Sequence, residues 1–167
     1  NVSFSEKIEF KNVSLKINNN TILDNISFVL NSGESLGIIG STGSGKSMIV
    51  YLLLGFFEAT SGEILIDGIN IKEINKRYIR EKISAIMQDS ELFNMSILDN
   101  IKIVNDDIDE SSVYNATEIS SIHNEIMDFS SKYRTTVVDN GVNLSGGQKQ
   151  RISIARVFLA NPPILIL

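Results

Sequence analysis

The stretch Gly40-Ser41-Thr42-Gly43-Ser44-Gly45-Lys46-Ser47 decides the fold of this chain. It fits the pattern G-x-x-x-x-G-K-[ST], and it lies between an apolar run at residues 36–39 and a second apolar run at residues 48–57. The length and the straight-chain residues of the second run favour a buried helix over a strand. The sequence therefore predicts the order strand, glycine-rich loop, helix.

The glycines of this loop allow the backbone to turn tightly, so that successive N–H groups point inward and the following helix adds the positive end of its dipole. An anion site results. Lys46 is expected to reach the β- and γ-phosphates of a nucleotide, and the Ser47 hydroxyl is expected to bind Mg²⁺. The alternative is a glycine-rich turn with an exposed lysine, but average composition gives a chance match in only about 0.5% of chains of this length.

Composition excludes several classes of protein. The 167 residues carry a formal net charge of −5, so the surface lacks the positive field that nucleic-acid binders use, and we expect no nucleic-acid partner. Hydrophobic residues make up 43%, as in a folded globular protein. The chain has no Cys and one His, His123, which excludes a structural zinc site, a thiol nucleophile and a disulfide framework. We interpret His123 as a surface or packing residue of a helix.

Membrane and export segments are not expected either. The longest apolar run, residues 48–57, is well short of the roughly 18 to 20 residues that cross a bilayer. The polar N-terminal residues lack the basic and apolar regions of a secretory signal. We therefore expect the chain itself to be soluble.

Hydrophobic periodicity divides the chain into three parts. Residues 1–89 begin with an alternating stretch at 8–39, typical of an antiparallel β layer, and continue through the glycine-rich loop. Further expected elements of this part are a strand at 63–67, an amphipathic helix at 75–82 and a core strand at 83–87.

The second and third parts are mainly helical. Residues 90–143 have helical spacing, which predicts an inserted helical lobe; the apolar positions are Val113, Ala116, Ser120, Ile122, Ile126 and Phe129. Residues 144–167 contain a predicted helix at 145–160 that ends before Pro162 and Pro163, then the apolar run 164–167. Such a run is typical of a strand buried on both faces of a parallel sheet.

A second glycine motif, Leu144-Ser145-Gly146-Gly147-Gln148, begins the last helix. Ser145 and Gln148 have the spacing of a capping box, which is a purely structural role. A cap does not need paired glycines, and each glycine costs a helix about 1 kcal/mol relative to Ala. The pair indicates that a phosphate bound to another chain approaches this backbone closely.

With the loop at residues 40–47, this motif resembles the signature of ATP-binding cassette (ABC) proteins, and the resemblance covers the whole chain. It implies an α/β fold of the P-loop NTPase class, with a mostly parallel core sheet, an N-terminal antiparallel β subdomain and an inserted α-helical subdomain. Gln88 resembles the family's Q-loop glutamine, which contacts Mg²⁺ or its water. The wording of residues 88–101 and 136–143 looks like the exporter subclass, although Val138 and Asp139 stand where relatives usually have Gly and Glu.

The resemblance implies ATP and Mg²⁺ as cofactors and a site shared by two domains. The nucleotide-binding residues are residues 40–47, Met48, Gln88 and Ile17, with Ser47 and Gln88 on the metal. Residues 144–148 would act on the nucleotide of a second nucleotide-binding domain. Ile17 stands where the family usually has an aromatic residue that stacks on adenine, so base affinity and selectivity are expected to be weaker.

The function implied is that of the ATP-binding domain of an ABC exporter, a transport-coupled ATPase bound to transmembrane domains at the cytoplasmic face of a membrane. The run 164–167 resembles the Walker B strand, and the sequence stops before the acidic pair and the switch His, so we place no catalytic residue within the chain and expect no appreciable hydrolysis by it. Alternatives are an ABC importer subunit and a non-hydrolysing regulatory module. Chromosome-maintenance ATPases are disfavoured because only 57 positions (145 − 88) separate Gln88 from Ser145.

Overall fold

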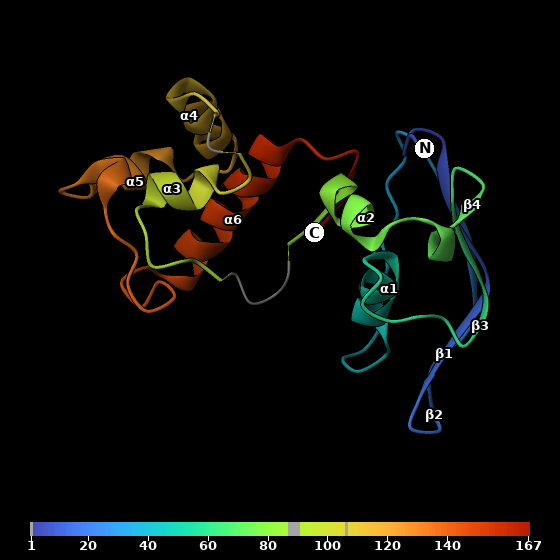
Figure 1. Cartoon of the computed structure of the whole chain (residues 1–167). Helices are drawn as coiled ribbons and strands as arrows, with labels where there is room; N and C mark the ends of the chain where they lie inside the picture. The colour runs from blue at the N-terminus through green and yellow to red at the C-terminus, as the bar shows by residue number, and fades with distance from the viewer. Residues whose placement is uncertain (1, 87–90, 106) are drawn as a thin grey trace. The chain divides into compact units, whose positions relative to one another are not determined.

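The computed structural model describes residues 2–86, 91–105 and 107–167. The chain forms two compact units, Asn1–Ile83 with Ile166 and Ser84–Leu165 with Leu167. The first contains a four-stranded sheet and the second a group of helices (Figure 1). Within the described ranges, no helix is both long and apolar enough to cross a bilayer.

The sheet of the first unit has the order β2-β1-β3-β4. Its strands are β1 (Lys7–Ile17), β2 (Asn20–Asn31), β3 (Ser61–Ile66) and β4 (Ile69–Asn70). All neighbouring strands are antiparallel, which confirms the predicted antiparallel layer over most of its length. A shift in register after Phe10 changes which side chains face the core, from Ile8 and Phe10 to Val13 and Leu15.

The first unit also contains three helical segments: α1 (Lys46–Leu53), the 3₁₀ turn η1 (Ile71–Glu73) and α2 (Lys76–Lys82). The predicted helix at 75–82 is thus confirmed. Helix α1 ends earlier than predicted, because Gly55 adopts a left-handed backbone with φ of +68° and its N–H bonds to the Leu52 carbonyl. The prediction of a buried helix to residue 57 is wrong at its end, where the Phe56 side chain is 56% exposed.

The expected strand at residues 36–39 is not formed. No regular secondary structure is present there, and the side chain of Ile39 is 96% exposed. A strand is stabilised by hydrogen bonds to its neighbours, and no described strand pairs with this segment. An apolar run alone therefore predicted the wrong local structure.

Two short strands, β5 (Ile83–Ala85) and β6 (Ile164–Ile166), pair with each other. Both strands were predicted, but the expectation that residues 164–167 are buried on both faces is wrong. Leu165 is 42% exposed and Leu167 is 84% exposed. In the described part of the chain this sheet has only two strands, so the outer edge of β6 has no neighbour.

The second unit is built around α6 (Gly146–Ala160), with α3 (Ile97–Lys102), α4 (Glu110–Ile119), α5 (His123–Asp128) and the 3₁₀ turn η2 (Lys132–Arg134). Figure 1 shows α3, α4 and α5 grouped about α6. The predicted helical spacing is confirmed: Val113, Ile122, Ile126 and Ile152 are fully buried in one core cluster. This core holds the first turn of α6 in place.

Candidate functional site

The loop at residues 40–47 leads directly into α1, as the sequence predicts. Gly45 occupies the position before the helix with φ of +89°, a left-handed backbone that glycine adopts without strain. A Cβ atom there would lie 2.8 Å from the carbonyl oxygen of Ile22 and 2.9 Å from a methyl of Leu23. Conformation and space therefore both require glycine, and β2 fixes where the helix begins.

The first turn of α1 receives no hydrogen bond from a capping side chain. In an α-helix the first N–H groups have no intrahelical partner, so they need a side chain, water or a ligand. The preceding loop bonds only to itself here: the Ser44 N–H donates to the Ser41 carbonyl, and the Met48 N–H donates to the Gly45 carbonyl. The free amides and the helix dipole together form the start of an anion site.

Lys46 lies across this loop. Its Nζ donates to the carbonyl oxygens of Gly40 and Ser41, both at 2.8 Å, and approaches the Ser44 hydroxyl at 3.5 Å. A lysine ammonium is a compact charge with three donors, so it holds the loop closed upon itself and places a positive charge where the amides converge. An arriving phosphate would find that charge already in the loop.

The other residues predicted at a nucleotide lie as follows. Ser47 is exposed in the first turn of α1, and Met48 follows it, half-buried. Ile17 is half-buried at the end of β1, where it pairs with Asn20. Gln88 lies outside the described residues. Within those residues, no group of three or more His, Asp or Glu side chains could hold a metal ion.

The second predicted motif begins α6. Ser145 and Gln148 form the complete capping box: the Gln148 N–H donates to the Ser145 hydroxyl at 3.2 Å, and the Ser145 N–H donates to the Gln148 side-chain carbonyl at 2.8 Å. Gly146 and Gly147 are exposed, and no atom lies within 4 Å of a Cβ added at Gly146. Leu144 is buried in the core cluster and anchors the motif.

A side-chain knot fixes the segment that follows the undescribed residues 87–90. The buried Asn100 side chain accepts from the Phe93 N–H at 2.9 Å and donates to the carbonyls of Phe93 and Ser96. The Arg156 guanidinium of α6 donates to the backbone carbonyls of Glu91 and Asn100, and burial lowers its pKa. Sequence reasoning missed both residues because their partners are backbone groups.

His123 has the packing role that the sequence predicts. Its Nδ1 lies 2.7 Å from the Tyr133 hydroxyl, which lies 2.5 Å from the hydroxyl of the buried Thr117. Thr117 donates its proton to the carbonyl of Tyr114, so Tyr133 must donate to Thr117 and accept from His123. The hydrogen bonds thus place a proton on Nδ1, and burial raises the pKa of Tyr133.

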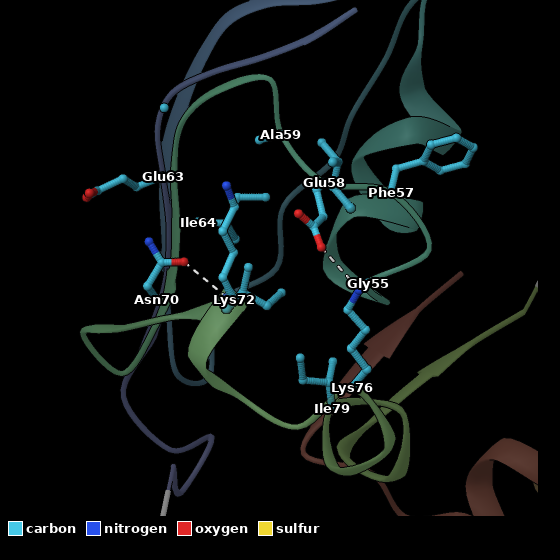
Figure 2. A pocket seen from close by; sticks show the side chains of 13 residues that line it. Gly55, Phe57, Glu58, Ala59, Glu63, Ile64, Asn70, Lys72, Lys76 and Ile79 are labelled. Atoms are coloured by element: carbon cyan, nitrogen blue, oxygen red, sulfur yellow. Dashed lines mark hydrogen bonds and ion pairs between the residues drawn. The ribbon is translucent and has the colours of Figure 1, made fainter. Parts of the chain in front are cut away.

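A hollow in the first unit lies apart from the predicted site. Figure 2 shows it among the residues that follow α1 and those of η1 and α2, with the ion pair between Glu58 and Lys76 (3.2 Å) near its edge. None of the residues predicted to contact nucleotide lines this hollow. Both side chains of the ion pair are more than half exposed, so the pair contributes little stability.

Comparisons with known proteins agree with this arrangement. The family model described as ABC transporter matches residues 23–167. The chain is 43% identical over 162 residues to YgaD of Bacillus subtilis, provisionally named a multidrug export ATP-binding/permease protein; the match covers 96% of this chain and 28% of YgaD. It is 44% identical over 160 residues to mitochondrial ABC transporter B family member 24 of Arabidopsis thaliana, with coverages of 95% and 24%.

A solved structure of a bacterial Atm1-family ABC exporter with ATP bound matches the fold with a TM-score of 0.92 and 36% identity. That match covers 96% of this chain and 29% of the exporter chain. The chain belongs to the ABC transporter family. The predicted α/β fold class is confirmed. The chain spans about a quarter of the length of the relatives it matches.

Proposed function

We propose that the chain binds ATP with Mg²⁺ through residues 40–48. The observation that carries this proposal is the start of α1, where an uncapped helix, a left-handed Gly45 and the Lys46 ammonium converge on one loop. These groups fit a triphosphate: the loop and helix amides donate hydrogen bonds to it, and Lys46 exchanges its bonds to loop carbonyls for bonds to phosphate oxygens.

Ser47 and Gln88 are the residues that would hold Mg²⁺, with a hydroxyl and an amide oxygen. Oxygen donors of this kind suit a hard cation that keeps several waters and also binds phosphate oxygens. When bound, the ion neutralises part of the charge of the triphosphate. Ile17 would pack against the base without a π face, and we therefore expect ATP and GTP to bind with similar affinity.

Residues 144–148 would contact the nucleotide held by a second copy or a second nucleotide-binding domain. The capping box satisfies the N–H groups of Ser145 and Gln148, whereas the first-turn amides of Gly146 and Gly147 have no intrahelical partner. Exposed glycines allow a phosphate to approach that backbone closely. One side of the triphosphate would face the loop of one chain, and the other side would face a helix N-terminus of its partner.

The whole protein that contains this chain would be an exporter that couples ATP binding and hydrolysis to transport, with transmembrane domains as partners and this chain at the cytoplasmic face. The relatives named above support an exporter over an importer, because their names or titles describe export or membership of an exporter family. The transport-coupled ATPase activity is that of the family.

Calorimetric titration with Mg-ATP tests nucleotide binding directly. Lys46→Ala should weaken binding by roughly 10- to 100-fold, because hydrogen bonds to a charged group contribute about 1.5 to 3 kcal/mol. Lys11→Ala is the matched control, since it removes an exposed lysine of β1 in the same unit. Equal affinity of the wild-type chain and Lys46→Ala would contradict the proposed site, and a parallel titration with GTP tests the role of Ile17.

A further inference from the structure

We propose that Glu125 is a positioning residue for the motif at 144–148. Its carboxylate holds the Gln148 amide and the Arg151 guanidinium, and thereby fixes the first turn of α6 in the form that a second chain's phosphate contacts. This inference rests on the function proposed above for that motif. It concerns a residue of a different helix, α5, which none of the predicted site residues includes.

The contacts of Glu125 use both of its carboxylate oxygens. Gln148 Nε2 donates to Oε2 at 3.0 Å, and Arg151 Nη2 donates to Oε1 at 2.5 Å. The Gln148 side-chain carbonyl in turn accepts from the Ser145 N–H at 2.8 Å. A continuous chain of hydrogen bonds therefore runs from α5 to the residue that caps α6.

The chemistry of the donors and acceptors allows one direction only. A backbone N–H can only donate, so the Ser145 amide must face the oxygen of the Gln148 side chain. An ionised carboxylate can only accept, so Glu125 must face the nitrogen of the same side chain. Gln148 is thus held at both ends, and its amide cannot turn over without losing both bonds.

Arg151 lies directly beneath the glycine pair. Its Nη1 would be 3.4 Å from a Cβ atom added at Gly147, and its Nε is buried with no partner among the described residues. Glu125 is its ion-pair partner there. The carboxylate therefore sets the place of a positive charge one turn below the amides of the motif.

Packing fixes Glu125 itself. It lies in the first turn of α5 between Ile122 and Ile126, which are fully buried in the core cluster, while its own side chain is 44% exposed. The backbone of α5 is thus anchored, and the carboxylate projects from a rigid support. Rigid support of this kind is what a precisely placed contact group requires.

Hydrogen exchange measured by NMR tests the positioning. Glu125→Ala should speed exchange of the Ser145 amide by about fivefold, the factor that corresponds to one net hydrogen bond. Glu125→Gln should restore exchange to within about twofold of wild type, because its side-chain carbonyl still accepts from Gln148 Nε2. Asp128→Ala, which removes the same charge from an exposed position of α5, should leave the Ser145 amide unchanged.

Sedimentation with Mg-ATP tests whether this positioning serves pairing. In Glu125→Ala, ATP-driven self-association should weaken by about fivefold while ATP binding to the single chain stays unchanged; Asp128→Ala should behave like wild type. Unchanged Ser145 exchange in Glu125→Ala would overturn the inference, as would faster exchange with unchanged association. If the wild-type chain failed to associate, the proposed contact between chains would fail, and the exchange result would still decide the positioning.

Discussion

Two helices of this chain begin after glycine-rich stretches, and they satisfy their first turns in different ways. Helix α1 begins at a left-handed Gly45 with no capping side chain, and only Lys46 bridges the loop before it. Helix α6 begins at Ser145 with both bonds of a capping box, and Glu125 supports that box from another helix. The same helix dipole is thus left for a ligand in one case and organised by the unit's own side chains in the other.

The difference indicates different roles for the two glycine groups. At α1 the glycine is required by the fold, because any side chain at Gly45 would meet the backbone of β2. At α6 the glycines are not required by the fold, because a Cβ at Gly146 would meet no atom within 4 Å. The first site would lose its structure on substitution, and the second would lose only its access.

Gly45→Ala is the change with the largest expected effect. It combines a left-handed backbone with contacts below 3.0 Å, so unfolding of the first unit should become easier by about 3 kcal/mol. Chemical denaturation with a probe of the first unit measures this free energy. Stability equal to that of wild type would show that the start of α1 is not constrained by β2.

Ser145→Ala should have a smaller effect. Loss of the cap should lower the free energy of unfolding of the second unit by about 1 kcal/mol. Ser47→Ala in the first turn of α1 is the matched control and should change stability little, because that turn has no side-chain cap to lose. Equal losses in the two variants would remove the contrast between the helix starts.

Gly146→Ala should act in the opposite direction. Replacement of a glycine whose backbone any residue can adopt stabilises a protein by about 0.5 kcal/mol, so the second unit should unfold at a slightly higher temperature. The added methyl group should at the same time weaken ATP-driven pairing of two chains. A variant that is destabilised would contradict the account, as would one that pairs as well as wild type.

A third helix start depends on pH. Asp109 caps α4, and hydrogen bonds from the Ser111 hydroxyl and the Ser112 backbone lower its pKa to about 2 from 3.8. Because the folded-state pKa is depressed, this stabilisation is present above about pH 4 and is lost as the pH falls toward 2. Asp109→Asn keeps a good cap but should show a smaller decrease in melting temperature over that range; an identical pH profile would contradict this assignment.

The local chemistry of the sequence predicted both helix starts. The spacing of Lys46 and Ser47 after Gly45, and of Gln148 after Ser145, specifies structure over a few residues, and the helices form where expected. The run at residues 36–39 shows where this reasoning stops, because a strand depends on partners distant in sequence.

The support from Glu125 could not be predicted for a similar reason. Its two partners lie 23 and 26 residues away on another helix, and no sequence periodicity links them. The carboxylate also occupies a partly exposed position, where a charged residue is unremarkable in a sequence. Its role becomes visible only once the packing of α5 against α6 sets the distances.

The central claim is that the uncapped start of α1 binds phosphate and the capped start of α6 does not do so within a single chain. Amide chemical shifts recorded during a Mg-ATP titration, at concentrations where the chain is monomeric, test it most directly. The account predicts large changes at residues 43–47 and none at Gly146 and Gly147. Changes at the two glycines of α6 with residues 43–47 unmoved would contradict it.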